Sequence, residues 1–552
     1  MKTRKQPIVA SQCVVASNHP LASTAGVEMF ARGGNAFDAA IATAFALTVV
    51  EPMMVSIFGA GMVLARDATG EITAVDNYAV APKAATPDMY RPDDARGGEM
   101  PTVGRENEVG YKAVGVPGAL RAWTTLVAER GTLPLGTVMG PAIRYAHDGY
   151  RASPYLVDCI AESAADLARF PASAAVFLPG GRPPAVGATI QRADYARTLE
   201  AIARDGADQL YDGPVGETVC RDMAANGGLI TMDDLRGYRI ERRTPVRGTY
   251  REHEVVSVPP TSSGGTHIVQ GLNLLEGFDV ARLGFGTVDG VHLLAETLKL
   301  CFADRFAYMG DPAFVDVPVA GLVDKEYAGQ RRKLIDPSRA QSFTAGRPPG
   351  VGGGHDTTHL TVMDREGNVV AMTQTLHALF GSKVTVPGTG MLLNNNMWLF
   401  DPHPGRANSV APGKRMLSSM SPTIVLRDGQ PLMALGTPGG TRIFAAILQA
   451  IVNVLDHGMT LQQAVEAPRV WTDGGPLLLE SGIAEDVRDG LRRLGHQLEV
   501  VGRVAGGMNG VYRDTDGLLH GAACWRADGT PAGYSGGFTD VPREGPLSRG
   551  FF

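Results

Sequence analysis

Two short runs rich in β-branched residues flank a turn-type cluster in this 552-residue chain, and this arrangement constrains the fold more than any other feature. The runs cover 358–363 and 369–376, and the cluster 364–368 carries Gly367 at a position where a positive φ is needed. Such a pattern predicts a β-hairpin.

The turn chemistry of this hairpin also sets its register. If Arg365 and Glu366 form a type I turn and Gly367 provides a bulge, Thr357 faces Thr375 across the two strands. Directly opposed residues have Cβ atoms roughly 4.5–5.5 Å apart, so one threonine hydroxyl can hydrogen-bond the other. A slip of one residue would separate the two hydroxyls.

A threonine hydroxyl is a weak nucleophile unless a base activates it, and the α-amine of an N-terminal threonine can be that base. A free α-amine titrates at about 7.7–8.0, which suits proton transfer near neutral pH. Thr357 is internal, so the chain would first have to break after Asp356, by attack of the Thr357 hydroxyl on the Asp356 carbonyl and hydrolysis of the ester. Two threonines alone are more typical of a polar hairpin edge without chemistry.

A second predicted hairpin is followed by two glycines and a helix. Its strands cover 423–426 and 432–435 around an Asp-Gly turn, and the apolar segment 441–455 after Gly439 and Gly440 is typical of a helix. Backbone N–H groups at a helix start lack internal partners and lie at the positive end of the helix dipole. The glycines therefore suit stabilisation of an oxyanion, although Gly-Gly before a helix is more often only a tight turn.

A dense series of further motifs runs along nearly the whole chain. Those before residue 350 are Gly33-Gly34-Asn35-Ala36, Asp38-Ala39-Ala40, Val116-Pro117-Gly118, Gly227-Gly228-Leu229-Ile230-Thr231, Pro259-Pro260-Thr261-Ser262-Ser263-Gly264-Gly265 with His267, and Ala303-Asp304-Arg305. Those after it are Thr357-Thr358-His359, Gly367-Asn368, Thr373-Gln374-Thr375-Leu376, Leu393-Asn394-Asn395, Lys414-Arg415, Leu417-Ser418-Ser419-Met420-Ser421-Pro422-Thr423 and Pro438-Gly439-Gly440. In kind and order, this series resembles the γ-glutamyltransferase family of N-terminal-nucleophile hydrolases.

The resemblance implies an α/β fold, a four-layer αββα sandwich, made from a precursor that is cut before Thr357. Residues 1–356 would form a large subunit, and residues 357–552 a small subunit that carries the nucleophile. The two segments would stay together as a heterodimer within one αββα domain. A higher oligomer of this pair is left open.

The resemblance also assigns catalytic roles. It implies that Thr357 is the nucleophile and that Thr375 is its hydrogen-bonding partner. Gly439 and Gly440 match the family's oxyanion hole.

Two serines match a substrate-binding pair of the family. Ser418 and Ser419 correspond to the serines that contact the carboxylate end of a glutamyl substrate. Without the resemblance, they would be interpreted as turn or capping hydroxyls in a loop.

Three positions depart from the family where its members hold the α-amino and α-carboxylate groups of glutamate. Tyr78 stands in place of an arginine and offers one neutral donor instead of a charged bidentate fork. His377 replaces an asparagine, so the charge there depends on pH. Leu399 replaces an acidic residue and cannot neutralise an ammonium, and Asp401 could do so only if the loop shifted. We still expect Tyr78, His377 and Asn396 to bind substrate.

These features predict a self-processing amidohydrolase that cleaves an amide of a small acyl or γ-glutamyl-like substrate. The acyl group would pass through an ester on Thr357 that is resolved mainly by water, since the segment 401–412 is shorter than the loop that covers the active site in some family members. A true γ-glutamyltranspeptidase or glutathione hydrolase, which transfers glutamyl groups to amino acids, is the alternative. An unprocessed, non-catalytic binding protein is the minor alternative.

Composition limits the partners. The net charge of -6 gives no basic footprint for nucleic acid or an anionic membrane, so a small-molecule amide is the expected partner. The 12 histidines are too dispersed for a metal ligand set, and no dinucleotide or Walker motif is present, so we expect no metal and no cofactor. His355 and His359 flank the cut site and are expected to orient it or to face solvent.

The cysteines favour a reducing compartment. Five of them are scattered, odd in number and without a Cys-x-x-Cys pair, so no disulfide framework is indicated. The basic amino terminus lacks an apolar run of signal-peptide length. We therefore expect a cytoplasmic location.

One apolar stretch, 39–50, could be a membrane span or a core helix. Asn35 can cap it, Asp38 falls in its first turn, and Pro52 stops it after about 15 residues, short of the roughly 20 that span a bilayer. We expect a helix in the core.

A second nucleophile motif occurs near the carboxy terminus. The segment 533–537 fits the Gly-x-Ser-x-Gly elbow of serine hydrolases, but that mechanism needs a histidine after the serine, and the last histidine is His520. We therefore expect Ser535 to be no nucleophile.

Overall fold

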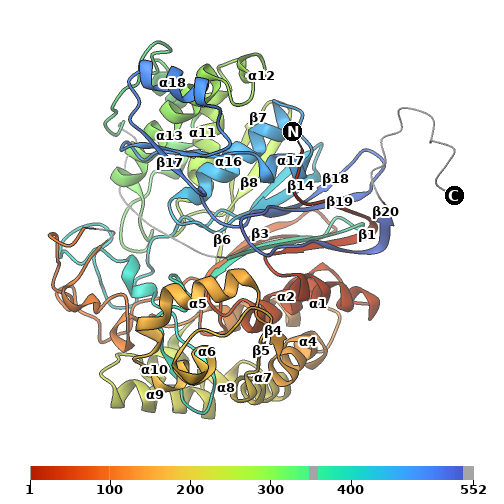
Figure 1. Cartoon of the computed structure of the whole chain (residues 1–552), viewed down its shortest axis with the longest axis vertical. Coiled ribbons are helices and arrows are strands. Elements are labelled where there is room, and N and C mark those ends of the chain that lie inside the picture. Colours follow the sequence, from red (N-terminus) through yellow and green to blue (C-terminus); the bar gives the residue numbers. More distant parts are fainter. Residues whose placement is uncertain (1, 98–99, 347–357, 539–552) are drawn as a thin grey trace.

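The computed structural model describes residues 2–97, 100–346 and 358–538, the last three of these by their backbone alone. Within this part of the chain, a 13-stranded sheet folds over into two stacked halves (Figure 1). In spatial order the first half contains β6 (Glu241–Arg243), β3 (Ile72–Asp76), β2 (Ala60–Arg66), β10 (Val369–Thr375), β9 (Thr358–Asp364) and β1 (Ile8–Ser17), with β20 (Ala532–Phe538) also beside β1. The second half continues with β19 (Leu519–Ala523), β18 (Asn509–Arg513), β14 (Gln430–Gly436), β13 (Thr423–Arg427), β8 (His253–Ser257) and β7 (Val246–Tyr250).

Helices cover both outer faces of these half-sheets (Figure 1). The lower layer holds α1 (Pro20–Ala31), α2 (Ala36–Val50), α3 (Ala119–Arg130), α4 (Leu135–Asp148), α5 (Pro154–Leu167), α6 (Pro171–Phe177), α7 (Ala193–Asp205), α8 (Asp208–Tyr211), α9 (Pro214–Ala225) and α10 (Met232–Gly237). The upper layer holds α11 (Gly264–Leu275), α12 (Val280–Leu283), α13 (Val288–Tyr308), α14 (Val319–Leu322), α15 (Lys325–Arg332), α16 (Arg442–Leu455), α17 (Leu461–Glu466) and α18 (Glu485–Arg493). Short strands outside the main sheet are β4 (Tyr150–Arg151), β5 (Thr189–Ile190), β11 (Thr385–Val386), β12 (Met391–Leu392), β15 (Val470–Trp471), β16 (Leu477–Glu480) and β17 (Leu498–Val501).

Alternating side chains along the strands separate three apolar cores. In β2, Val63 packs with the lower helices, whereas Met62 and Leu64 belong to a different cluster. In β14, Met433 packs with the upper helices, whereas Ala434 shares the cluster of Met62 and Leu64. The two half-sheets therefore meet across a central core, and each buries its other face under helices. The predicted αββα sandwich is confirmed.

Strands from either side of the predicted cut interleave in the sheet. β9 and β10 follow residue 357 in the sequence, yet they pair with β1 and β2 from the amino-terminal part. Two segments divided at this point would share one sheet and one core. The division into 1–356 and 357–552 itself stays a prediction.

Helix α2 is the core helix that the sequence predicts. The Asn35 Oδ1 accepts hydrogen bonds from the N–H groups of Phe37 and Asp38, and Asp38 Oδ2 accepts the Asn35 N–H over 2.9 Å. All 15 residues of the helix are buried, and it ends at Val50, two residues before Pro52. Among the described residues, no helix combines the length and the apolar character that crossing a bilayer requires.

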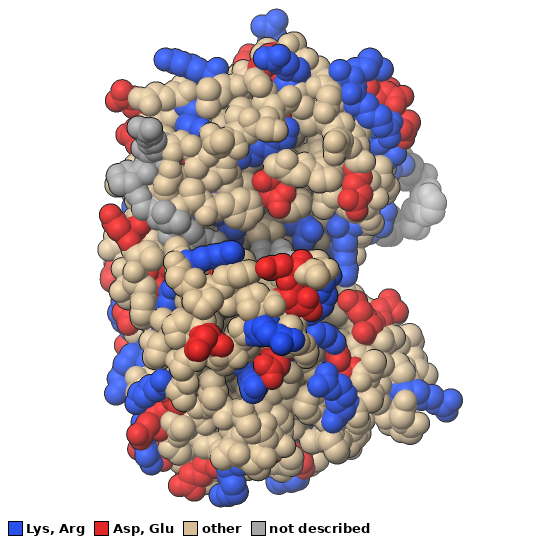
Figure 2. Space-filling view, turned by 90° about the vertical axis from the view of Figure 1, so that its left-hand side faces the viewer, with Lys and Arg blue, Asp and Glu red and all other residues tan. Residues whose placement is uncertain are grey.

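The surface carries charges of both signs. On the face seen in Figure 2, basic and acidic side chains are interspersed, and neither sign forms one extended patch. This distribution agrees with the small net negative charge of the chain. It offers no basic stripe on that face for a nucleic-acid backbone.

Candidate active site

The β9–β10 hairpin turns as the sequence predicts. Gly367 has a φ of +84°, the conformation expected of the bulge residue. Asp364 N–H donates to the Asn368 carbonyl over 3.1 Å, and Asn368 N–H donates back to Asp364 Oδ1 over 2.9 Å. The turn therefore fixes the two strands at one register.

That register is the predicted one as far as the structure describes it. The last described pair places Gln374 opposite Thr358. Asp356 and Thr357 lie outside the described residues. The pairing of Thr357 with Thr375 therefore stays a prediction. The register is confirmed up to the adjacent pair, Thr358 and Gln374.

Thr375 is buried at the end of β10 and is held from several sides. Its Oγ1 accepts the His377 N–H over 2.6 Å, and its backbone pairs with Ala60 of β2. A Cβ at Gly59 would lie only 2.5 Å from the Thr375 carbonyl oxygen, so glycine is required for this close approach. The hydroxyl of Thr375 thus has a fixed position.

The first described residue of β9 is anchored by a buried carboxyl group. Thr358 Oγ1 donates to Glu51 Oε2 over 2.8 Å and accepts from Asn18 Nδ2 over 3.1 Å. Burial raises the pKa of Glu51 to about 8, and the bond from Thr358 opposes that shift. Sequence reasoning missed Glu51. The sequence feature that could have identified Glu51 is a carboxylate directly after an apolar helix.

His359 links the two hairpins. Its Nδ1 lies 2.9 Å from Thr373 Oγ1 and its Nε2 2.8 Å from Thr361 Oγ1. Burial lowers the pKa of His359 to about 3, so the ring is neutral, and it does not face solvent. Its role in orienting the cut site stays a prediction. A Cβ at Gly436 would lie 2.4 Å from the ring, so the histidine packs directly on the end of β14. His355 lies outside the described residues.

Gly439 and Gly440 lie between the end of β14 and the start of α16 at Arg442, as the sequence predicts. Their φ angles are +139° and +67°, and a Cβ at Gly439 would lie 2.5 Å from Ala505 Cα. Within the described residues, no acceptor is found for either N–H group. Both donors precede a helix N-terminus, which is a suitable place for a developing negative charge.

The predicted serine pair is buried and backed by a cation. The carbonyl of Ser418 accepts both the N–H and the Oγ–H of Ser263, each over 2.9 Å. Arg305, near the end of α13, donates from Nη2 to Ser419 Oγ over 2.8 Å and from Nε to Ser263 Oγ over 3.0 Å. Sequence reasoning quoted Arg305 as part of a motif but gave it no role.

Asp304, the neighbour of Arg305, ties this region to the chain before the predicted cut. Its carboxylate accepts hydrogen bonds from Tyr327, Arg331 and the Gly346 N–H, the last over 2.7 Å. Gly346 is the last described residue before 347–357. The chain up to residue 346 is therefore fixed to α13 at Asp304, the neighbour of Arg305.

His377 and the segment after Asn394 are held together by hydrogen bonds that backbone N–H groups donate. Asn395 N–H donates to the Leu376 carbonyl over 2.9 Å, and Ala378 N–H donates to Asn395 Oδ1 over 3.0 Å. His377 has a φ of +83°, and its ring meets that of Trp398 edge-on, with centroids 5.2 Å apart. The structure thus brings His377 close to the predicted glutamate-binding segment.

The other predicted substrate residues lie in buried surroundings. Asn396 is fully buried, and within the described residues neither polar atom of its side-chain amide has a hydrogen-bond partner. Tyr78 and Leu399 share one apolar cluster with Met397. Tyr78, Asn396 and Leu399 are themselves uncharged, whereas the carboxylate of Asp76 accepts the Tyr78 N–H over 2.9 Å.

Asp401 is engaged elsewhere. Its Oδ1 accepts from the N–H and Nδ1 of His403, over 2.9 Å and 2.8 Å, and its Oδ2 accepts from Arg406 over 3.0 Å. This carboxylate is therefore not placed to take a substrate ammonium.

Ser535 is not at a nucleophile elbow. It lies within β20, which pairs antiparallel with β1, and its carbonyl accepts from Ser11 Oγ over 2.7 Å. An elbow requires a sharp turn between a strand and a helix, so the expectation that Ser535 is no nucleophile agrees with its place in the fold.

A cavity of about 760 Å³ lies away from all of these residues. It is bounded by the amino-terminal residues 2–7, the end of α16, and the turns of the β13–β14 and β18–β19 hairpins. Those turns are at the opposite end of β14 from Gly439, so this cavity is separate from the candidate active site.

Comparison with known proteins gives consistent matches over nearly the whole chain. A family model described as Gamma-glutamyltranspeptidase matches residues 22–534. The acylase ACY 1 proenzyme of Pseudomonas sp. (strain SE83) is 54% identical over 534 residues, which cover 97% of this chain and 95% of that protein. The glutathione hydrolase proenzyme of Escherichia coli (strain K12) is 38% identical over 544 residues, which cover 96% and 93%. The crystal structure of cephalosporin acylase from Bacillus halodurans superposes with a TM-score of 0.88 at 32% identity, covering 97% of this chain and 98% of that one.

Proposed function

Because the chain belongs to the gamma-glutamyltranspeptidase family, we propose that it cuts itself before Thr357 and then uses the hydroxyl of that residue to attack an amide bond. It is a self-processing amidohydrolase of this family. In the proposal, residues 1–356 and 357–552 are the two subunits of the resulting heterodimer.

The proposed reaction is a two-step acyl transfer. The free α-amine of Thr357 accepts the hydroxyl proton as Oγ bonds to the acyl carbonyl carbon, and the N–H groups of Gly439 and Gly440 stabilise the oxyanion. Collapse breaks the carbon–nitrogen bond, and the proton passes from the α-amine to the leaving amine. Water then cleaves the ester by the same proton path, releasing the acid and restoring the Thr357 hydroxyl.

One observation carries this assignment. The ring of His359 packs on the backbone of Gly436, and it thereby joins the start of β9 to the end of β14. Thr357 immediately precedes β9, and Gly439 follows β14 by three residues. This contact supports a nucleophile and an oxyanion hole that face one another.

We assign the substrate as the amide of an acyl group that ends in a carboxylate but lacks an α-ammonium, such as glutaryl. The buried Arg305 behind Ser419 supports recognition of the carboxylate. The apolar cluster that contains Leu399, together with the engaged Asp401, disfavours a substrate ammonium at this position, because a buried charge without a partner is costly.

The relatives' names agree with this assignment. The Pseudomonas protein is named an acylase, and the Bacillus halodurans structure a cephalosporin acylase. We therefore propose that the leaving amine is the amino group of a bulky ring system, as in an acylated cephalosporin.

A second candidate is glutathione hydrolysis with glutamyl transfer to amino acids. The Escherichia coli relative is a glutathione hydrolase, and the serine pair Ser418 and Ser419 suits a glutamyl carboxylate as well. The two candidates differ in whether the pocket accepts an α-ammonium.

The test compares two chromogenic substrates that differ only in that group. Glutaryl-p-nitroanilide and γ-glutamyl-p-nitroanilide are assayed on protein whose two chains and amino-terminal Thr357 are verified by electrophoresis and Edman sequencing. We expect kcat/KM to favour the glutaryl compound by at least about tenfold, the effect of one unpaired charge. Preference for the glutamyl compound would support glutathione hydrolysis, and turnover by uncut protein would contradict the whole mechanism.

We also propose a cytoplasmic location. All five cysteines are free, and four of them are buried, which suits a reducing compartment. Fractionation of the producing cells with periplasmic and cytoplasmic marker enzymes tests this proposal.

A further inference from the structure

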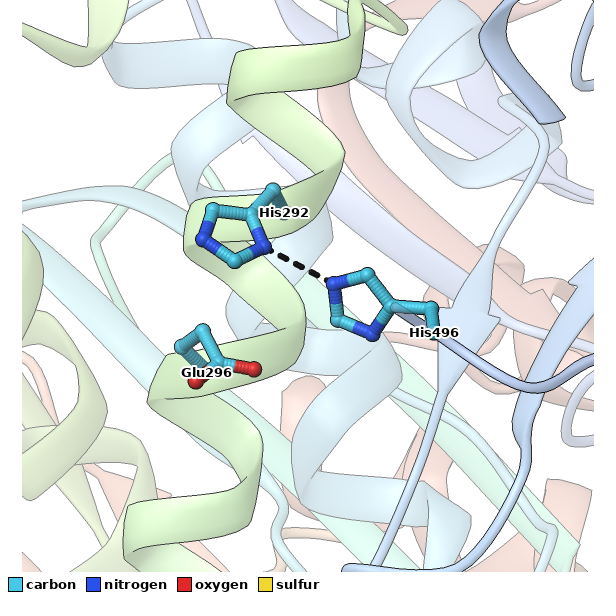
Figure 3. A group of neighbouring side chains, drawn as sticks. All are labelled: His292, Glu296 and His496. Atoms are coloured by element: carbon cyan, nitrogen blue, oxygen red, sulfur yellow. Dashed lines mark hydrogen bonds between the residues drawn. The ribbon is translucent and has the colours of Figure 1, made fainter. Parts of the chain in front are cut away.

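Two histidines and a glutamate from distant parts of the chain meet in the upper helical layer. His292 and Glu296 lie one turn apart on the same face of α13, and His496 approaches them from the segment between α18 and β17 (Figure 3). One nitrogen of each imidazole and one carboxylate oxygen all lie within 4.8 Å of one another. From the sequence we expected no metal ligand set, because the histidines are dispersed, but the fold joins two of them.

The hydrogen bonds of His292 prepare it as a ligand. Its Nε2 lies 2.8 Å from the carbonyl of Asp336, which can only accept, so the ring hydrogen is on Nε2. The lone pair of Nδ1 therefore points inward, toward His496 Nε2 at 2.8 Å. A backbone carbonyl that fixes the outer nitrogen of a histidine is a common arrangement around metal ligands.

The three groups are buried together. His292, Glu296 and His496 are only 2%, 0% and 6% exposed. They are therefore held inside the upper helical layer, shielded from bulk solvent.

Glu296 supplies the negative charge of the cluster. One oxygen accepts from Lys299 Nζ over 2.7 Å, and the other accepts from the Gln341 N–H over 3.0 Å. Lys299 also donates to the Gln341 carbonyl over 2.9 Å, so this ammonium keeps a partner if its bond to Glu296 is given up. A metal ion would therefore compete with the Lys299 ammonium for the carboxylate of Glu296.

We propose that His292, Glu296 and His496 form a binding site for a divalent transition metal, of which Zn²⁺ fits best. Two imidazoles and one carboxylate suit Zn²⁺, whereas Ca²⁺ and Mg²⁺ take oxygen ligands. On binding, the hydrogen bond between the two rings opens and the hydrogen on His496 Nε2 is exchanged for one on Nδ1, so the ring stays neutral. Water completes the coordination.

The site would act on stability rather than on the acyl transfer. It fastens α13 to the segment before β17, while Arg305 lies nine residues beyond Glu296 on the same helix, roughly 14 Å away along its axis. A ligand that binds only the folded protein stabilises it by mass action. Bound metal should therefore raise the unfolding temperature and leave kcat unchanged.

The experiment titrates EDTA-treated, full-length protein with Zn²⁺ in a calorimeter and with Co²⁺ in an absorption spectrometer. We expect one equivalent to bind, with the visible bands of four-coordinate Co²⁺ and a higher unfolding temperature. His496→Ala should weaken binding by at least about 100-fold. Lys299→Met should tighten it by roughly tenfold, because a like charge next to the ion is removed.

The matched control is His457→Ala, which removes a half-buried histidine of the same helical layer that contacts Phe285. It should bind Zn²⁺ as the unaltered protein does. The proposal is overturned if the unaltered protein takes up no Zn²⁺ or Co²⁺, a result that does not depend on the folding of any variant. Equal binding by His496→Ala and His457→Ala would overturn it as well.

Discussion

Arg305 Nη2 lies 2.8 Å from Ser419 Oγ, and both side chains are completely buried although 114 residues separate them in the sequence. The same guanidinium donates to Ser263 Oγ over 3.0 Å, so one cation orients two hydroxyls. The guanidinium thereby fixes the position of the Ser419 hydroxyl and places a positive charge directly behind it. Such a charge suits recognition of an acyl carboxylate, which is the role proposed for this pair.

Replacing Arg305 with methionine should raise KM for glutaryl-p-nitroanilide by roughly 10- to 100-fold, because the charge behind Ser419 is lost. Turnover of butyryl-p-nitroanilide, which has no carboxylate, should change much less. Steady-state kinetics on the two substrates give the comparison. Arg331→Met is the control, since it removes another buried arginine, which pairs with Asp304 over 3.1 Å, and it should not alter the ratio. An equal loss on both substrates would contradict the role of Arg305.

The sequence predicted the local features of this site and missed its buried charges. The β9–β10 turn and the cap at Asn35 depend on residues a few positions apart, so short patterns were enough. Arg305 and Glu51 depend on partners brought together from distant segments. A charged residue in an apolar stretch shows that a partner must exist but not which one, and that information is in the tertiary fold.

Glu51→Gln should remove a pH dependence of stability. Burial raises the pKa of Glu51 from 4.5 to about 8, so the folded protein holds this proton more tightly than the unfolded chain does. The protonated Glu51 carboxyl therefore contributes to the free energy of unfolding. This contribution is complete below pH 4.5, declines as the pH rises and is lost above about pH 8. Glutamine cannot ionise, so the variant should lose less stability between about pH 5 and pH 9.

Thermal unfolding of both proteins across that range measures the difference. The groups near Glu51 include Asp528, Tyr155 and Cys159, and all of them remain in the variant. Their titration is therefore common to both curves. If the unfolding temperatures of the unaltered protein and of the Glu51→Gln variant change in parallel with pH, this carboxyl has no raised pKa.

Gly439→Ala should lower kcat by about 10²- to 10³-fold, the usual effect of losing an oxyanion donor. Glycine at this position has a φ of +139°, and an added Cβ would lie 2.5 Å from Ala505 Cα, so the backbone must move. Stopped-flow or steady-state assays of the processed enzyme give kcat. Gly458→Ala is the control, because it has a φ of +62° and open space around it, and its kcat should not change.

Asn396→Asp should shift the substrate preference toward γ-glutamyl compounds. Asn396 is buried with no hydrogen-bond partner for its amide among the described residues, and aspartate has the same shape. A carboxylate there can pair with an α-ammonium, so the ratio of kcat/KM for γ-glutamyl over glutaryl anilide should rise by roughly tenfold or more. Asn396→Ala, which adds no charge, should lower both values alike. An unchanged ratio in Asn396→Asp would remove this residue from the acyl pocket.

Thr357→Ala and Thr375→Ala should separate the nucleophile from its partner. Without the Thr357 hydroxyl there is no attack on Asp356 or on substrate, so the variant should stay a single 58.2 kDa chain and lose turnover by on the order of 10³-fold or more.

Thr375→Ala leaves the nucleophile in place. This variant should cut itself slowly and then turn over substrate at a reduced rate. Thr375→Ser restores a hydroxyl at this buried position and should recover most of both rates. Electrophoresis over time follows the cutting, and anilide assays follow turnover. Complete cutting of Thr357→Ala at the normal rate would assign the nucleophile to another residue.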